Sequence, residues 1–361
     1  MSWISNQLEI SHSNHTPLRP MEGLRGIAVF LVFLFHYCSL TTPFINPNSI
    51  SGTALQFIHG FGDIGVDLFF VLSGFLIYGT LIRKPTKYTP YIKKRITRIY
   101  PTFLAVFVLY LALSVIMPSE SKLPNGITNS AIYIIQNLLL LPGILDIKPM
   151  ITVAWSLSYE FLYYLLMPLI IASLRMRSWH YKARIAFWSI VSIVGFAVFH
   201  FYGGHIRLII FVSGILLYEI YDNKLIRPPA YFGTFCLLLA VTTFAVRGHL
   251  GLSGIIPTLI LFILFFFTCL ESFVSKTGSA RWLTYTPLRW LGNMSYSYYL
   301  IHGLTLKACF FAAGAFLELS NQNEYIMWLG IAPLFAVTLI VSFGLFVIIE
   351  RPLSLQSPTK K

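Results

Sequence analysis

The sequence predicts an all-α, polytopic integral membrane protein with about ten transmembrane helices. Of its 361 residues, 56% are hydrophobic and only 11% are charged, whereas a typical soluble domain has about 25% charged residues. Several apolar runs reach the length of about 18 residues or more that a spanning helix needs. Because unpaired backbone groups are costly in lipid, we expect these runs to be helical.

The expected spans follow one another along the chain, separated by shorter polar segments. Residues 1–20 are polar and lack the apolar core of a signal peptide, so we expect a cytoplasmic tail. Residues 21–352 form the expected transmembrane domain, and 353–361 form a second cytoplasmic tail. A further apolar stretch at 129–145 is too short and too polar to count, and we expect a re-entrant or interfacial segment. The expected spans are 24–43, 57–82, 99–117, 153–174, 185–202, 207–221, 230–247, 252–270, 290–313 and 326–349.

The basic residues indicate the orientation of the chain. With both termini in the cytoplasm, nearly all Lys and Arg residues lie on the cytoplasmic side, as the positive-inside rule requires. The net charge of +13 is then explained by topology and by contact with anionic lipid headgroups, not by nucleic-acid binding. The cysteines are scattered in apolar runs without metal or redox spacing, so we expect no metal site. On the outer side, the loops carry only Lys122, Lys148, Arg207 and Arg247.

The first span carries two polar residues, Arg25 and His36, at positions that share one helix face. At about 100° per residue, their spacing returns the chain to within roughly 20° of its starting direction. Their axial separation is about 16 Å, so Arg25 lies near the inner surface and His36 lies past the bilayer centre. An ionisable group at that depth is costly and suggests function. A purely structural hydrogen bond from His36 is the alternative.

Other polar residues fall at a depth similar to that of His36. A water-accessible chamber explains a shared depth for Glu160, Asp67 and His302 better than scattered structural residues do. Since a histidine beside a carboxylate can act as a general base, we expect His36, Glu160 and Asp67 to be catalytic. Helix pairing is the alternative role for the two carboxylates, and a structural hydrogen bond is favoured for Tyr299 and His302. The candidates for substrate or oxyanion binding are Ser156, Ser158, Tyr299 and His302.

A dense basic segment, RKPTKYTPYIKKRITR at 83–98, precedes the third expected span. Arg95 and Arg98 share a helix face at i, i+3 spacing, which suits bidentate contacts with phosphates. Together with Arg25, they are expected to bind a phosphorylated ligand from the cytosol. Ordinary positive-inside bias with lipid headgroup contact is the alternative.

Six motifs resemble those of membrane-bound acyltransferase family 3, which includes bacterial polysaccharide O-acyltransferases. They occur in order along almost the whole chain, which makes the set more specific than any one of them. The motifs are RPMEGLRGIA at 19–28, GVDLFFVLSGFLI at 65–77, RITRIYP at 95–101, WSLSYEFLYYLLMP at 155–168, GNMSYSYYLIH at 292–302 and ERP at 350–352.

The resemblance implies an enzyme of the plasma or inner membrane that moves an acyl group, most often acetyl, from cytoplasmic acyl-CoA. The implied acceptor is a hydroxyl of a cell-surface or lipid-linked carbohydrate, and no cofactor is permanently bound. Members often carry a C-terminal extracytoplasmic SGNH domain; this chain ends shortly after the last expected span, so we expect none. It would then complete the transfer alone or pass the acyl group to a separate extracytoplasmic partner.

Three alternatives stay open at this point, one of which is a non-catalytic partner in polysaccharide export that would tolerate loss of His36. A covalent acyl-histidine on His36 is an alternative to general-base catalysis. A transporter or flippase for a glycan or small solute is an alternative to the enzyme, because buried carboxylates and histidines also serve proton coupling. That class would move its substrate without acyl-CoA.

Overall fold

The computed structural model describes residues 3–9, 18–316 and 324–355. Within these ranges the regular secondary structure is helical, with no β-strand, which confirms the expected all-α class. Parts of both expected tails, residues 1–2, 10–17 and 356–361, lie outside the described residues. The number of spans and the cytoplasmic placement of the termini remain predictions.

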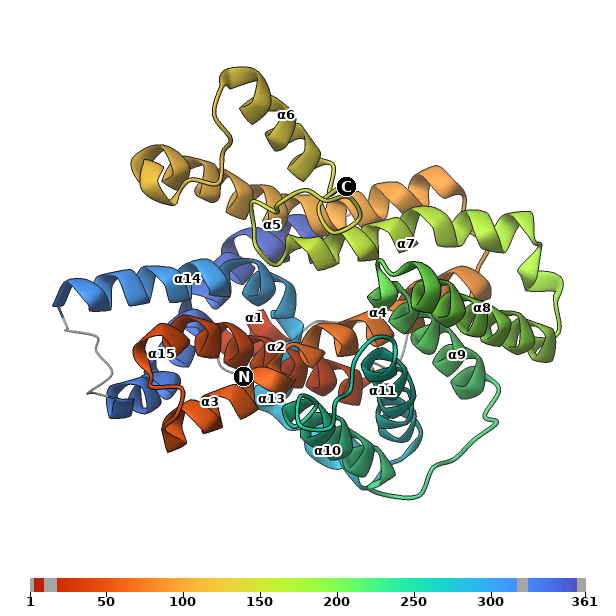
Figure 1. Cartoon of the computed structure of the whole chain (residues 1–361). Coiled ribbons are helices and arrows are strands. Elements are labelled where there is room, and N and C mark those ends of the chain that lie inside the picture. The colour runs from red at the N-terminus through yellow and green to blue at the C-terminus, as the bar shows by residue number, and fades with distance from the viewer. Residues whose placement is uncertain (1–2, 10–17, 317–323, 356–361) are drawn as a thin grey trace.

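The first half of the chain supplies α2 and α4 near the middle of the view and α5, α6 and α7 at its top (Figure 1). Helix α5 contains Pro101 and begins well before the expected span at 99–117, because the basic residues that precede the apolar run continue the same helix. The helices are α1 (Trp3–Leu8), α2 (Arg19–Thr41), α3 (Ile50–Gly62), α4 (Ile64–Arg83), α5 (Tyr88–Ile116), α6 (Ile127–Leu138) and α7 (Ala154–Ser173).

The second half completes the bundle. Its last helix continues into a π-helical segment at Phe346–Leu355, which contains the closing Glu-Arg-Pro motif. The helices are α8 (Tyr181–Tyr202), α9 (Ile210–Asp222), α10 (Phe232–Ala245), α11 (Ile256–Val274), α12 (Ser279–Leu283), α13 (Thr286–Asn293), α14 (Ser295–Phe316) and α15 (Glu324–Leu345).

Two of the expected spans are broken helices. The span at 57–82 breaks at Asp63, between α3 and α4, just after two glycines, Gly60 and Gly62. The span at 290–313 breaks at Met294, between α13 and α14. Hydropathy predicts how long an apolar stretch is, but it does not detect such a break when the residues on both sides are apolar.

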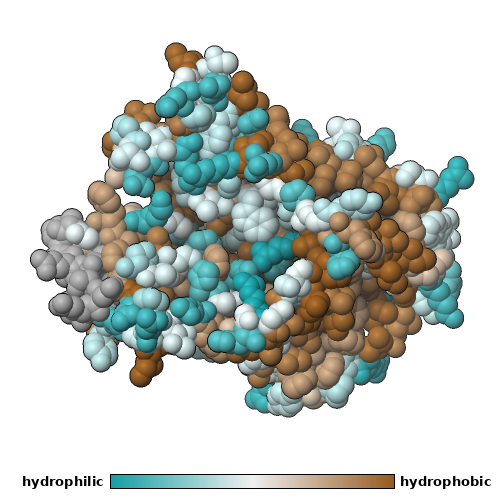
Figure 2. All heavy atoms as spheres, viewed as in Figure 1, coloured by the Kyte–Doolittle hydropathy of each residue, from teal (hydrophilic) through white to brown (hydrophobic). Residues whose placement is uncertain are grey.

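Seven helical stretches of the described residues are long and apolar enough to cross a membrane. Helix α6 has 12 residues, fewer than the roughly 20 that a spanning helix needs, as expected for the stretch at 129–145. Figure 2 shows a broad hydrophobic surface on the side where α7 and α8 lie, as a lipid-facing surface requires, and hydrophilic residues in a hollow at the middle of this face. The stretches are Arg19–Phe44, Ile50–Arg83, Tyr88–Ile116, Ala154–Ser173, Tyr181–Tyr202, Ile256–Val274 and Trp328–Leu355.

Glycines bring α2 and α13 into direct backbone contact. A Cβ atom at Gly292 would lie 1.8 Å from the carbonyl oxygen of Glu22, and one at Gly26 would lie 2.2 Å from that of Leu288. Real Cβ atoms do not approach an oxygen so closely, so only glycine fits at these positions. The crossing fixes the rotation of α2 and thereby the direction in which Arg25 projects.

A second close crossing joins α4 and α9. A Cβ atom at Gly74 would lie 2.1 Å from the carbonyl oxygen of Phe211, and one at Gly214 would lie 2.0 Å from that of Val71. This contact fixes the rotation of α4 and therefore decides which of its residues face the centre of the bundle.

We expect Gly292→Ala to lower the free energy of unfolding by about 1–3 kcal/mol or more, because the new methyl group forces α2 and α13 apart. Thermal unfolding of the purified protein in detergent measures the effect. Gly303→Ala is the matched control, since no atom lies within 4 Å of a Cβ at this position. Equal midpoints for the two variants would contradict the prediction.

Candidate active site

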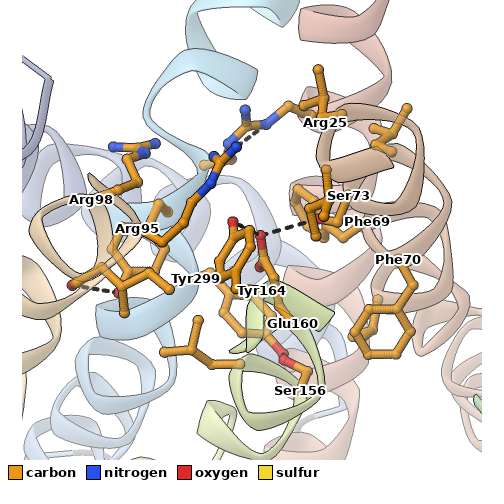
Figure 3. Close-up of a pocket in the computed structure, with 18 residues that line it drawn as sticks. Arg25, Phe69, Phe70, Ser73, Arg95, Arg98, Ser156, Glu160, Tyr164 and Tyr299 are labelled. Atoms are coloured by element: carbon orange, nitrogen blue, oxygen red, sulfur yellow. Dashed lines mark hydrogen bonds between the residues drawn. The ribbon is translucent and has the colours of Figure 1, made fainter. Parts of the chain in front are cut away.

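A cavity of about 200 Å³ lies where α2, α4, α5, α7 and α14 meet (Figure 3). One wall is the apolar face of α4, and the other walls carry charged and hydroxyl groups. In Figure 3, the three arginines lie on one side of the cavity, and Glu160, Tyr164 and Ser156 lie on the other. The lining residues are Arg25, Val66, Phe69, Phe70, Leu72, Ser73, Leu76, Ile77, Arg95, Arg98, Ile99, Ser156, Leu157, Glu160, Tyr164, Ser295, Tyr296 and Tyr299.

Arg25 reaches the cavity from α2, as its motif suggested. Its Nε and Nη2 atoms donate hydrogen bonds of 3.1 and 2.8 Å to the Ser295 hydroxyl, at the start of α14. The acidic residue of the same motif, Glu22, lies outside the cavity and forms an ion pair of 2.7 Å with buried Arg289 of α13. In this motif, then, Gly26 and Glu22 hold α2 against α13, and Arg25 faces the site.

Arg95 is held by aromatic rings. Its guanidinium carbon lies 5.0 Å from the ring centre of Tyr91 and 4.9 Å from that of Tyr164, within the range of a cation–π interaction. Its Nε atom is buried and has no hydrogen-bond partner among the described residues. The charge of Arg95 is therefore free to interact with an anion in the cavity.

Arg98 lines the cavity too, but a carboxylate already neutralises it. Its Nη1 atom lies 2.7 Å from Oε1 of Glu350, which is completely buried. The other oxygen of Glu350 accepts hydrogen bonds from the Ser297 backbone N–H (3.0 Å) and hydroxyl (2.5 Å). Glu350 thus also caps the first turn of α14. The expectation that Arg95 and Arg98 together bind phosphates did not anticipate this partner for Arg98.

Glu160 is in the cavity, as its depth suggested. Its Oε1 atom accepts hydrogen bonds from the hydroxyls of Tyr164 (2.5 Å) and Ser73 (3.3 Å). With Glu350 paired to Arg98, the ionised side chains around the cavity leave an excess of positive charge. Such a site favours an anionic ligand.

The candidate hydroxyls separate into two groups. Ser156 and Tyr299 both line the cavity, and their oxygens lie 2.7 Å apart. Ser158 is fully buried, and its hydroxyl bonds to the carbonyl oxygen of Ala154 in its own helix at 3.3 Å, so its observed contact is structural.

Asp67 does not face His36. It is buried, and its Oδ1 atom lies 3.5 Å from Nε of Arg207, which also forms an ion pair of 2.7 Å with Asp63. Asp67 does not line the cavity. The rotation of α4, fixed by its glycine contact with α9, directs this carboxylate away from His36.

His36 is not oriented by a carboxylate, contrary to our expectation. No Asp or Glu of the described residues forms a hydrogen bond or ion pair with it; its Nδ1 atom instead lies 2.9 Å from the carbonyl oxygen of Val32 and 3.3 Å from Nε2 of His302. His36 and His302 do not line the cavity. Tyr299 does, and its ring centre lies 6.2 Å from that of His302.

Comparison with known proteins decides the family. A family model described as an acyltransferase domain matches residues 20–347. The chain belongs to acyltransferase family 3. No solved structure matches this acyltransferase.

Two named relatives are acyltransferases as well. Acyltransferase MdmB of Streptomyces mycarofaciens is 27% identical over 321 residues, which cover 80% of this chain and 79% of that protein. O-acetyltransferase OatA of Staphylococcus aureus is 26% identical over 320 residues, which cover 78% of this chain but only 49% of OatA. This acyltransferase is therefore a multi-pass membrane enzyme that transfers acyl groups.

Several residues at the candidate site of this acyltransferase were not singled out from the sequence. Ser73 and Tyr164 lie inside two of the motifs but carry no charge, so hydropathy and charge patterns overlook them. Tyr164 lies four residues after Glu160, on the same helix face, and this spacing was the available signal. Glu350 lies in the ERP motif at 350–352, but its pairing with Arg98 was not anticipated. No group of three or more metal-ligating side chains occurs in the described part of the chain.

Proposed function

We propose that this acyltransferase transfers a short acyl group, such as acetyl, from acyl-CoA to a hydroxyl of a cell-surface or lipid-linked carbohydrate at the plasma or inner membrane. The observation that carries the proposal is the cavity, which combines an excess of arginines with an apolar wall. A thioester of CoA has the same two parts, an anionic nucleotide and an uncharged acyl end.

The proposed donor site uses the arginines. Arg25 and Arg95 have no carboxylate partner in the described structure, so they keep their charge for phosphates. Arginine suits phosphates because its planar fork donates two parallel hydrogen bonds. Helix α5 extends beyond Arg95 into the rest of the basic segment, which would meet the remainder of the nucleotide. This placement puts the entrance on the cytoplasmic side in the proposed topology.

The apolar wall of the cavity is the proposed binding site for a short acyl group. Phe69 of the α4 wall lies beside Tyr299, with ring centres 6.1 Å apart, and Phe70 lies on the side of Ser156 in Figure 3. Pockets for drug-sized ligands have volumes of about 300–1,000 Å³. A cavity of about 200 Å³ therefore fits the thioester end of the donor and not the entire molecule.

In the proposed reaction, His36 takes the proton of the acceptor hydroxyl, and the resulting alkoxide attacks the thioester carbon. The carbon–sulfur bond breaks, and the CoA thiolate leaves and takes the proton from the imidazolium. The hydroxyls of Tyr299 and Ser156, which both lie 3.1 Å from the carbonyl oxygen of Val153, would turn from it to stabilise the oxyanion. The route requires the acyl group to pass Phe69 and Tyr299, whose ring centres are 6.1 Å apart at the cavity border. Acyl transfer through His36 itself is the second form of this mechanism.

The test is transfer of label by the purified protein in nanodiscs. Label from [1-¹⁴C]acetyl-CoA should appear in a carbohydrate acceptor, and CoA should be released in equal amount. Movement of a glycan across the bilayer without consumption of acetyl-CoA would contradict the proposal and favour a flippase.

Arg95→Ala should raise the KM for acetyl-CoA about 10-fold or more, with a smaller effect on kcat, because a hydrogen bond to a charged group contributes about 1.5–3 kcal/mol. Steady-state kinetics in nanodiscs measures both constants. Lys94→Ala is the matched control, since this neighbouring cation is exposed and does not line the cavity. If both variants raise KM equally, the positive charge of the segment acts only through general electrostatics.

A further inference from the structure

Two histidines, His36 and His302, contact each other outside the cavity, near Tyr299. Nε2 of His302 lies 3.3 Å from Nδ1 of His36, and the ring centres are 4.9 Å apart with the planes nearly perpendicular, at 80°. His302 is completely buried, whereas His36 is half-buried. No carboxylate in the described part of the chain bonds to either ring. The pair therefore has to be explained without the acidic partner that usually orients a catalytic histidine.

Backbone carbonyls decide where the hydrogens of this pair lie. Nδ1 of His36 is 2.9 Å from the carbonyl oxygen of Val32, and Nδ1 of His302 is 2.9 Å from that of Tyr298. A carbonyl oxygen can only accept, so each Nδ1 carries a hydrogen. If His302 also carried one at Nε2, two N–H groups would point at each other across 3.3 Å. His302 is therefore neutral, and its Nε2 lone pair shares the single Nδ1–H of His36 with the carbonyl oxygen of Val32, which lies closer.

We propose that His302 is a positioning residue: the Val32 carbonyl sets the Nδ1–H tautomer of His36, and His302 holds the ring in the orientation that makes Nε2 the reacting nitrogen. Nε2 of His36 has no hydrogen-bond partner among the described residues, so its lone pair is available to a proton or an acyl carbon. The tautomer of an imidazole is set by the bond that its other nitrogen makes. Here a neutral imidazole takes the place of the carboxylate, which avoids burying an anion. Only the role of Nε2 as the reacting nitrogen rests on the proposed function; the contact between the two rings does not.

The decisive comparison is His302→Gln with His302→Asn. The glutamine oxygen can reach the position of Nε2 and accept from His36, whereas the asparagine amide reaches only the position of Nδ1 and keeps the bond to Tyr298. We expect His302→Gln to retain kcat within about 10-fold and His302→Asn to lose about 100-fold, because a small misplacement of a reacting group costs about that much. KM for acetyl-CoA should stay within about 3-fold of wild type in both, since His302 does not line the cavity.

A merely structural role predicts a different result. A structural role would lower the unfolding temperature and the yield of both variants. The kcat per folded molecule would then be the same for His302→Gln and His302→Asn. Equal kcat values for the two variants, or a loss confined to KM, would overturn the proposal.

A second measurement does not depend on activity. Solid-state ¹⁵N spectra of histidine-labelled protein in lipid distinguish protonated from unprotonated ring nitrogens, and the His36 signals are those that vanish in His36→Asn. We expect the hydrogen of His36 on Nδ1, and a hydrogen on Nε2 would overturn the inference. If wild-type protein transfers nothing from acetyl-CoA, the proposed function fails while these spectra still decide the tautomer.

Discussion

His36→Ala should reduce acyl transfer by about 10³-fold while leaving the protein folded and the KM for acetyl-CoA nearly unchanged. A positioned general base contributes about 10²–10⁴-fold, and a covalent acyl-histidine would make the loss larger. The KM should change little because His36 does not line the cavity that holds the arginines. Folding should survive because the ring is half-buried and bonds only to Val32 of its own helix and to His302.

A nearby histidine supplies the control for this experiment. His59 stacks on Phe35 with ring centres 4.4 Å apart and contacts the Ser39 hydroxyl at 3.1 Å, but it contacts neither His302 nor the cavity. His59→Ala should keep transfer within about 3-fold of wild type. Initial rates per folded protein, determined by size-exclusion chromatography, compare the variants. A His36→Ala protein that transfers acyl groups at the wild-type rate would exclude both forms of the mechanism.

The membrane character and the course of the helices could be predicted from the sequence because both follow from local composition. Each expected span coincides with a helix or with a broken pair of helices of the structure. The breaks at Asp63 and Met294 could not be predicted, because they depend on partners far away in the chain. Arg207 pairs with Asp63, and Glu350 caps the helix that starts after Met294.

The candidate site was predicted less completely, because depth along a helix says nothing about rotation around it. Glu160 and Asp67 lie at comparable depth, yet Glu160 enters the cavity and Asp67 faces Arg207. The direction of Asp67 depends on how glycines let α4 approach α9, which is a property of the packed bundle. His302 was predicted to lie at a depth similar to that of His36, but their contact at 3.3 Å could be found only from the structure.

The largest effect on stability is expected for Glu350→Ala. The variant leaves Arg98 without its ion-pair partner. It also leaves the backbone N–H of Ser297, in the first turn of α14, without a hydrogen-bond acceptor. Removing one partner of a buried ion pair typically costs about 3–5 kcal/mol, because the remaining charge is left uncompensated. Thermal and denaturant unfolding in detergent measure the loss. Glu120→Ala is the control, since its pair with Lys307 is exposed and such pairs contribute about 0–1 kcal/mol.

The double variant Arg98→Met, Glu350→Leu separates the ion pair from the helix cap. If the uncompensated charge of Arg98 dominates the loss, removing both charges should restore most of the stability, because apolar replacements of buried pairs are often neutral. The part that is not restored measures the bonds from Glu350 to Ser297, which no leucine can replace, at about 1–3 kcal/mol. Strictly additive losses in the double variant would show that Arg98 and Glu350 are not energetically coupled. Arg98 would then be free to bind phosphate as Arg95 is. Comparison of the single and double variants therefore also decides how many arginines of the donor site are available to bind phosphate.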